Sequence, residues 1–420
     1  MGVSRFTFAR GNARKVASIP LYGLGALASL VVPRRPGTWV IGCGSGVGEG
    51  ALALYLEARA ADPSLTITWM ARNNRDLVDA AALGIPAVPV MSWPGFWLTL
   101  RAEVIAVTHG FGDANRFGTR GAFIVQLWHG IPLKHIHLDS AATVRAPFLP
   151  NTAIVRATLH ALYRRAATAI ALLPAASEVS AERLRTAFGL GPDRVVVTGD
   201  PRDDVLAQGT AEQRRSTARA RIAAALNIPP LGEAPVLLHA PTWRDGAADP
   251  ALPTDDQWRS IAGYLDETGA HLLVRPHPLG VGDYGRGTTF SPRIHLLGSD
   301  LVPDITPVLP SIDTLVTDYS SIAYDFSLTG GTVLFLAPDV ASYAASRGLY
   351  EPYGRFSGGR EVNTWDEVLA QLRRAASDSS FRTELAEHTA ALARRFFDHT
   401  DGNNTVRVYG EIVSRLKGTA

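Results

Sequence analysis

Short apolar runs alternate with helix-like segments along most of the chain from residue 37. In the first half of the chain the apolar runs lie at 38–42, 65–70, 87–90, 104–109, 123–128, 169–173 and 194–199. Between them lie segments such as ALALYLEARAA and DLVDAAALG, which read as helices. Continuous apolar strands separated by helices are typical of βαβ units with a buried parallel sheet. The pattern therefore predicts an α/β fold.

The alternation stops at residues 227–235 (NIPPLGEAP), where prolines and a glycine indicate a linker. It resumes with apolar runs at 236–242, 271–276, 293–297, 313–318 and 332–337. The last forty residues read as two helices, one ending near Phe396 and one near Lys417. We therefore expect two doubly wound α/β domains facing a central cleft, at 37–226 and 227–400, with a C-terminal helix at 401–420.

A stretch without any charged residue, 17–33, lies close to the N-terminus. It is shorter than the roughly 20 apolar residues of a bilayer-spanning helix, and it contains Pro20. Basic residues flank it on both sides, namely Arg10, Arg14, Lys15, Arg34 and Arg35. We expect residues 1–36 to form a membrane-proximal amphipathic segment whose arginines meet anionic headgroups. A helix packed on the protein's own surface is the alternative, because it needs the same pattern.

Composition excludes several classes of protein. The 41 Lys and Arg residues against 39 Asp and Glu give a net charge of +2, which excludes a nucleic-acid binder that relies on bulk positive charge. The single cysteine, Cys43, excludes a disulfide scaffold and a cysteine-rich metal site, and favours the cytoplasm. The glycine-rich segment 42–48 fails the G-x-G-x-x-G spacing, so a tight turn explains it. We expect no cofactor and no metal ligands, while a metal requirement stays open.

The segment Trp128-His129-Gly130-Ile131-Pro132-Leu133-Lys134 follows one of the expected strands. Histidine is the side chain best suited to take a proton near neutral pH, and Gly130 lets the backbone approach a ligand. A single histidine is more often structural. A position at a strand end that faces the expected cleft favours a catalytic role for His129, with Gly130 and Lys134 as further substrate-binding residues.

Three strand ends of the second half carry polar side chains. The first offers a hydroxyl, an aromatic face and a guanidinium, from Thr242, Trp243 and Arg244. The second places Arg275 and His277 on one side of an extended chain. The third is the Thr317–Ser321 loop described next. Taken singly, each motif has a structural explanation. Because all three fall at strand ends of one domain, they favour a shared binding site.

The third strand ends in Thr317, Asp318, Tyr319, Ser320 and Ser321, and residues 322–328 read as the following helix. Ser320 or Ser321 would be the N-cap of that helix. A helix N-terminus with free N–H groups and hydroxyls attracts anions, and neighbouring Arg and protonated His side chains suit a diphosphate.

The motifs WHGIPLKHI, HAPTWRD, RPHP and TDYSSIAYDF resemble those of the CDP-glycerol glycerophosphotransferase family of teichoic acid and capsule synthesis. The likeness extends from the N-terminal apolar segment to residues 347–350. It implies a GT-B-like pair of Rossmann domains and peripheral attachment to the cytoplasmic face of the membrane. It also implies transfer of a polyol phosphate from CDP-glycerol or a similar CDP-polyol to a lipid-linked saccharide or a polyol-phosphate polymer.

The resemblance also implies roles for single residues. His129 corresponds to the family's catalytic base, and His277 to the histidine that holds the donor's phosphates. The 317–321 loop belongs to the donor site, and Arg202 matches the arginine of a G-x-P-R-N-D segment. Asp203 stands where that segment usually has Asn, which adds a negative charge near a polyanionic ligand.

The mechanism that follows starts at His129, which takes the proton of an acceptor hydroxyl. The hydroxyl attacks the β-phosphorus of the CDP-polyol, and CMP leaves. Two rival interpretations remain: a GT-B glycosyltransferase that uses a nucleotide sugar, and a non-catalytic glycan-binding scaffold. The sequence leaves open the identity of the polyol, the acceptor, the choice between priming and polymerising, and the oligomeric state.

Overall fold

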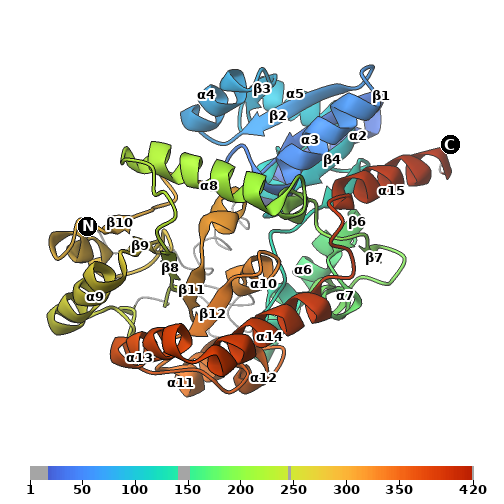
Figure 1. Cartoon of the computed structure of the whole chain (residues 1–420). Coiled ribbons are helices and arrows are strands. Elements are labelled where there is room, and N and C mark those ends of the chain that lie inside the picture. Colours follow the sequence, from blue (N-terminus) through green and yellow to red (C-terminus); the bar gives the residue numbers. More distant parts are fainter. Residues whose placement is uncertain (1–17, 141–151, 245–246, 419–420) are drawn as a thin grey trace. The chain divides into compact units, whose positions relative to one another are not determined.

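The computed structural model describes residues 18–140, 152–244 and 247–418 (Figure 1). Contacts divide the chain into two compact units. The first unit holds the described residues of 8–131, 136–205 and 397–420, and the second those of 132–135 and 206–396. Each unit is built around its own parallel sheet.

The first unit contains a seven-stranded sheet of order β3-β2-β1-β4-β5-β6-β7 in which every pairing is parallel. Its strands are β1 (Arg35–Gly42), β2 (Thr66–Ala71), β3 (Ala87–Pro89), β4 (Ala102–Val107), β5 (Phe123–Gln126), β6 (Ile170–Ala175) and β7 (Val195–Val197). Each of the apolar runs expected in the first half overlaps one of these strands. The strand order reverses between β1 and β4, where doubly wound sheets bind ligands.

Helices cover this sheet and bury large aromatic residues such as Trp39 and Trp69. They are α2 (Ile19–Val31), α3 (Glu49–Ala61), α4 (Asn74–Ala82), α5 (Trp93–Arg101), α6 (Ala153–Ala167), α7 (Glu178–Phe188) and α15 (Asn404–Gly418). Figure 1 shows the C-terminal helix α15 beside α3, which it contacts. The carboxylate of Asp204 fixes the start of α15, because it accepts the backbone N–H groups of Asn404 and Thr405 at 2.9 and 2.8 Å.

The second unit contains a five-stranded parallel sheet of order β10-β9-β8-β11-β12. Its strands are β8 (Val236–Ala240), β9 (His271–Val274), β10 (Ile294–Leu296), β11 (Thr314–Thr317) and β12 (Thr332–Phe335). These match the apolar runs expected after the linker, so the predicted α/β class with parallel sheets is confirmed. Here the order reverses between β8 and β11.

Among the described residues, the second unit also contains helices, three of which begin at a capping box. The helices are α8 (Ala211–Leu226), α9 (Asp255–Thr268), α10 (Ile322–Ser327), α11 (Val340–Arg347), α12 (Tyr353–Ser357), α13 (Trp365–Ser377) and α14 (Ser379–Phe396). Helices α8, α9 and α13 each begin at a capping box with a threonine at the N-cap. In each box the threonine side chain and the Gln or Glu side chain three residues later accept hydrogen bonds from two backbone N–H groups. Trp258 and Trp365 are fully buried in the core that these helices form with the sheet.

Helix α8 belongs by its contacts to the second unit, whereas the expected domain boundary follows it at residue 227. The helix packs on the 3₁₀ turn Thr306–Ser311, and Arg215 and Arg219 pair with Asp313 at 2.9 and 3.6 Å. The proline-rich residues after α8 form no helix or strand. Composition marks where regular structure stops, and these tertiary contacts decide to which sheet the preceding helix belongs.

Helix α2 occupies most of the uncharged N-terminal stretch, and Arg10, Arg14 and Lys15 lie outside the described residues. Within the part of the chain that the structure describes, no helix is long and apolar enough to cross a membrane. One face of α2 packs on the protein, since a Cβ atom at Gly25 would lie 1.9 Å from the carbonyl oxygen of Phe117. The apolar side chains of Leu24, Leu27, Leu30 and Val31 are exposed.

Arg34 does not have the role expected from its place beside the apolar stretch. Its guanidinium donates hydrogen bonds to the backbone carbonyls of Thr99, Ala102, Gly118 and Arg120. Burial lowers its pKa to about 10. Arg34 therefore ties the junction of α5 and β4 to the segment 118–120 of the first unit, and the expectation that it meets lipid headgroups is corrected.

Candidate active site

His129 follows β5, and its ring contacts two aromatic rings. Its imidazole stacks on that of His109, with ring centroids 4.1 Å apart and planes at 4°, and the Trp128 ring centroid also lies 4.1 Å away. Trp128 has φ of 64° and Gly130 has φ of 130°. A non-glycine residue in the left-handed region is uncommon and is maintained only where the surrounding structure enforces it. The backbone therefore turns sharply on both sides of His129.

A carbonyl group selects the tautomer of His129. The Nδ1 atom lies 3.4 Å from the backbone oxygen of Thr108, which can only accept a hydrogen bond. In the neutral ring Nδ1 therefore carries the hydrogen, and Nε2 keeps the lone pair that can take a proton. This is the arrangement that a general base needs.

Arg202 holds the backbone of the same loop. Its Nη1 donates to the carbonyl oxygen of His129, and its Nε lies 4.0 Å from the buried carboxylate of Asp203. These contacts direct part of the Arg202 guanidinium toward the protein itself. Asp203, whose charge was expected near the ligand, lies beside Arg202.

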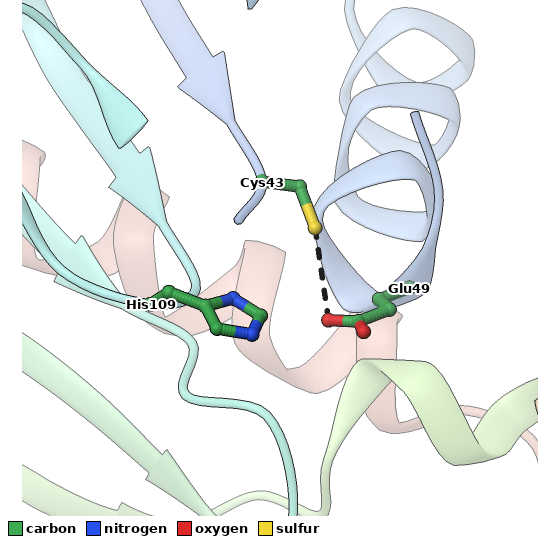
Figure 2. A group of neighbouring side chains, drawn as sticks. All are labelled: Cys43, Glu49 and His109. Atoms are coloured by element: carbon green, nitrogen blue, oxygen red, sulfur yellow. Dashed lines mark hydrogen bonds between the residues drawn. The ribbon is translucent and has the colours of Figure 1, made fainter. Parts of the chain in front are cut away.

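The turn after β1 packs against the turn after β4. Cys43 Sγ lies 3.6 Å from Glu49 Oε2, and ligand atoms of Cys43, Glu49 and His109 all lie within 4.8 Å of one another (Figure 2). Burial, assisted by the charge of Glu49, raises the pKa of the Cys43 thiol to about 12. The thiol is therefore protonated at neutral pH in the absence of another ligand, and Cys43 is not poised as a nucleophile.

In the second unit, Arg244 and Asp318 form a buried ion network. Arg244 lies 3.0 Å from Asp318, and it makes two hydrogen bonds of 2.8 Å to Asp339. The guanidinium also lies over the rings of Tyr319 and Tyr343, at 5.1 and 4.8 Å from their centroids. Burial raises the pKa of Asp318 despite the opposing charge of Arg244. Both residues were expected to bind the donor directly, and the structure shows them bonded to the protein.

The two threonines at these strand ends differ from each other. Thr317 donates from its hydroxyl to the carbonyl of Ala240 at 2.7 Å, which joins β11 to β8. The backbone N–H of Thr242 donates a hydrogen bond to the Asp318 carboxylate at 2.8 Å. The hydroxyl oxygen of Thr242 is buried and has no hydrogen bond to any described residue. A buried hydroxyl without a partner is costly, which makes Thr242 the better candidate for a ligand contact.

Helix α10 lies where it was expected but is only six residues long. Ser321 occupies its N-cap position, and the hydroxyl makes no capping hydrogen bond. Ser320 accepts the N–H of Ile322 at 3.5 Å. So short a helix aligns few peptide dipoles, so an anion site here would depend mainly on direct hydrogen bonds. The two hydroxyls remain candidates for direct contacts with a ligand.

A cluster of cations surrounds His277. The Trp243 ring stacks on His277 with centroids 5.8 Å apart, and Arg347 covers the Trp243 ring at 4.8 Å. His277 is exposed, yet partial desolvation and the charges of Lys134, Arg275 and Arg347 lower its pKa to about 4. His277 is therefore neutral at pH 7 until an anion compensates the positive charges.

Backbone contacts place Lys134 in this cluster. The chain at Lys134 pairs with Leu349 in an antiparallel bridge, and the N–H of His135 binds the carbonyl of Gly348 at 3.1 Å. Arg275 donates to the carbonyl oxygens of Val302 and Pro303 at 2.8 and 3.2 Å, so part of its guanidinium holds a loop. The structure thus gathers Lys134, Trp243, Arg275 and His277 in the second unit, and His129, Gly130 and Arg202 in the first.

Comparison with known proteins assigns the chain to a family. Residues 36–414 match the family described as CDP-glycerol:poly(glycerophosphate) glycerophosphotransferase. The chain belongs to this family. The match covers all the motifs discussed above.

Relatives of this family member are teichoic acid enzymes. The teichoic acid ribitol-phosphate polymerase TarK of Staphylococcus aureus is 24% identical over 298 residues, 70% of this chain and 52% of that protein. The teichoic acid ribitol-phosphate primase of Bacillus spizizenii is 26% identical over 371 residues, 86% of each chain. The chain thus spans about half the length of several curated relatives it matches. The solved wall teichoic acid polymerase TagF has the same fold, with TM-score 0.73, 20% identity and 98% coverage of both chains.

Sequence reasoning missed His109, Glu49 and Arg347 as residues of these clusters. A signal existed for His109, since it follows β4, one of the two strands between which the sheet order reverses. No comparable signal marks Arg347, because it comes from the end of α11 and reaches Trp243 only through folding.

Proposed function

We propose that the protein transfers glycerol phosphate, or a related polyol phosphate, from a CDP-activated donor to a hydroxyl of a lipid-linked or polymeric acceptor and releases CMP. Family membership supports the reaction class. The observation that carries the mechanism is the 3.4 Å contact between His129 Nδ1 and the Thr108 carbonyl oxygen, which favours the tautomer that leaves a lone pair on Nε2. General-base assistance of this kind contributes roughly 10²–10⁴ in rate.

In this proposal the first unit binds the acceptor and the second binds the donor, as Rossmann-type domains of the GT-B plan. His129 removes the proton of the acceptor hydroxyl, the oxygen attacks the β-phosphorus, and the bond to CMP breaks. Arg202 keeps the His129 loop in place through the backbone carbonyl. Gly130, with φ of 130°, allows the chain to turn directly after the base.

The diphosphate of the donor is held by the cations of the second unit. Lys134 and Arg347 carry positive charge close to His277, and Arg275 contributes a further charge. A bound diphosphate supplies the negative charge that lets His277 take up a proton and donate a hydrogen bond. Trp243 offers an aromatic surface beside these charges, suited to border the cytosine ring. Thr242, Ser320 and Ser321 provide hydroxyls at the same strand ends.

We further propose that the protein attaches peripherally to the cytoplasmic face of the membrane through α2. The helix has no charged side chain, and its exposed Leu24, Leu27 and Leu30 form an apolar surface. It contacts α5, which adds exposed Trp93. Cosedimentation with anionic vesicles tests this: Leu24→Asp with Leu27→Asp should reduce binding, whereas Leu56→Asp, at an exposed leucine of α3, should not. Equal binding by both variants would remove the proposal.

The central experiment incubates purified protein with CDP-glycerol or CDP-ribitol and candidate acceptors, and follows the release of CMP. We expect His129→Asn to lower kcat about 10²–10⁴-fold with little change in donor affinity. His277→Asn should mainly weaken donor binding. His160→Asn, at an exposed histidine of α6, is the matched control and should leave both quantities unchanged.

Three outcomes would change the assignment. Near-normal turnover by His129→Asn would show that another group is the base. A nucleoside diphosphate together with a new glycosidic bond would identify a glycosyltransferase instead. Calorimetric binding of the CDP-ligand without turnover on any acceptor would support the non-catalytic scaffold.

A further inference from the structure

The turns after β1 and β4 bring a thiol, a carboxylate and an imidazole together. Ligand atoms of Cys43, Glu49 and His109 lie within 4.8 Å of one another, and Figure 2 shows the three side chains converging from two strand ends and the start of α3. These are the strands between which the sheet order reverses. We propose that the three residues bind one divalent transition metal ion, Zn²⁺, in the first unit.

The distances suit a tetrahedral ion. Zn–S bonds of about 2.3 Å and Zn–N or Zn–O bonds of about 2.0 Å place neighbouring ligand atoms roughly 3.5 Å apart. Cys43 Sγ and Glu49 Oε2 already lie 3.6 Å apart. The largest separation in the group exceeds the tetrahedral value by only about 1 Å. His109 is exposed, so its ring can close that distance by a small side-chain rotation.

The hydrogen bonds of Thr108 prepare His109 as a ligand. The Thr108 hydroxyl has two acceptors besides the imidazole, the Asp113 carboxylate at 3.2 Å and Cys43 Sγ at 3.3 Å, and when it donates to either of them its oxygen is left to accept. Its oxygen accepts the N–H of Gly44 at 3.0 Å and faces His109 Nδ1 at 2.8 Å. Nδ1 is then the donor, and Nε2 keeps the lone pair for a metal. An outer hydrogen bond on the second imidazole nitrogen is the usual support of a histidine ligand.

The glycine-rich turn makes room for this arrangement. A Cβ atom at Gly44 would lie 2.2 Å from Cγ of His109 and 2.4 Å from its Nδ1. Only glycine therefore allows the imidazole to lie over the turn. Glu49, the first residue of α3, has φ of 53°, an uncommon conformation that aims its side chain back toward Cys43. The glycine-rich segment 42–48, which lacks the spacing of a phosphate-binding loop, thus makes room for the proposed metal ligands.

The ligand set selects the ion. Thiolate and imidazole favour Zn²⁺ over Mg²⁺ or Ca²⁺, which prefer oxygen ligands. Three protein ligands leave a fourth position for water on the exposed side of His109. On binding, Zn²⁺ replaces the thiol proton, which passes to solvent. The ion also fixes the imidazole of His109, whose ring stacks on that of His129. His109 thereby becomes a positioning residue for His129, and only this consequence rests on the proposed function.

Spectroscopy of the tag-free, full-length protein loaded with Co²⁺ tests the site directly. Cys43 is the only cysteine of the chain, so a thiolate-to-cobalt charge-transfer band can arise only from it. We expect one Co²⁺ per chain, the intense visible bands of a tetrahedral ion, and displacement by Zn²⁺. Cys43→Ser should abolish the charge-transfer band. A pale octahedral spectrum without that band would overturn the proposal.

Zn²⁺ affinity, measured by competition with a chromophoric chelator, provides a second test. His109→Asn and Glu49→Gln should each weaken binding at least about 100-fold, since even loss of an outer partner costs roughly 10–100-fold. Glu57→Gln, at a carboxylate on the same helix α3, is the matched control and should bind normally. His109 is exposed, so its variant should keep the wild-type melting temperature even if Cys43→Ser fails to fold. Equal affinity of His109→Asn and wild type would refute the site.

Metal binding and CMP release are measured separately. Loss of turnover with normal Zn²⁺ binding would concern the transferase proposal alone, and absent Zn²⁺ binding with normal turnover would concern the metal site alone. If Zn²⁺ positions His109, His109→Asn should lower kcat several-fold at unchanged donor KM. An unchanged kcat would overturn that positioning role.

Discussion

The two units hold the side chains at their strand ends by different physical means. In the first unit, His129 is fixed by ring stacking, by one carbonyl and by the backbone turn at Trp128. In the second unit, a buried ion network of Arg244, Asp318 and Asp339 fixes the loops after β8, β11 and β12. The first arrangement relies on ring stacking and backbone groups, with one guanidinium, that of Arg202, on the His129 carbonyl, and the second relies on paired charges.

The difference matches what each site has to do in the proposed reaction. A stacked imidazole can change its protonation state with little rearrangement, because ring stacking contributes only about 0.5–1.5 kcal/mol. A buried ion pair is far more rigid, since removing one partner leaves an uncompensated charge. The second unit can therefore present Lys134 and Arg347 to an anion from fixed positions. The following predictions test this contrast.

Breaking the ion network should have the largest effect. Asp318→Asn leaves the buried Arg244 with a single carboxylate partner, and we expect a loss of about 3–5 kcal/mol in the free energy of unfolding. Urea denaturation measures it. Asp256→Asn removes an exposed partner of Arg259 and should change stability by less than about 1 kcal/mol. Similar losses for the two variants would contradict the rigidity assigned to the second unit.

The buried His239 of β8 should make the protein sensitive to acid. Burial lowers its pKa to about 4, against 6.5 in the unfolded chain. Its contribution to stability is complete above pH 6.5 and is lost as the pH falls toward 4, because only the unfolded chain binds the proton there. The full loss is about 3 kcal/mol.

Urea denaturation at several pH values checks this prediction. His239→Leu should flatten the dependence between pH 6.5 and 4, whereas His160→Leu, at an exposed position, should leave it as in the wild type. An equally steep loss of stability in His239→Leu would show that another group carries the acid sensitivity.

Removing the support of the His129 loop should have an intermediate effect. Arg202→Ala deletes a charged hydrogen bond to the His129 carbonyl, and we expect kcat to fall about tenfold with donor KM unchanged. Arg202→Lys should recover part of the loss. Arg194→Ala also removes an arginine–carbonyl bond, to Ile170 of the same unit, and should not change kcat. A rise in KM alone would instead indicate direct ligand contact by Arg202.

The smallest expected effect is a change of donor affinity with pH, caused by the cations around His277 in the second unit. A bound diphosphate raises the pKa of His277 from about 4, so the complex takes up a proton and binding tightens as the pH falls. CDP-glycerol is suitable because its diphosphate diester does not titrate near neutral pH. Calorimetry at pH 8 and pH 6 should show a few-fold higher affinity at the lower pH. His277→Asn should abolish that dependence, and a flat wild-type profile would contradict the assigned role.

Several features were readable from the sequence because they depend on near neighbours in the chain. Apolar runs located the strands, and the turn into α10 was placed correctly. The extent of α10 was predicted to within one residue, whereas the missing capping hydrogen bond of Ser321 was not. The ion pairing of Arg244 could not be predicted from the sequence either, because its partner Asp339 lies 95 positions away in the chain. A guanidinium after a strand fits a phosphate or a carboxylate equally well.

The sequence by itself determined the α/β class, the position of each strand and the motif that contains His129. These follow from local periodicity and from turn residues, which act over a few positions. Only the tertiary structure decided that Cys43 and His109 meet, that Arg202 supports His129 and that α8 joins the second unit. Those outcomes depend on which strands lie side by side, and that order is set by packing between segments distant in the chain.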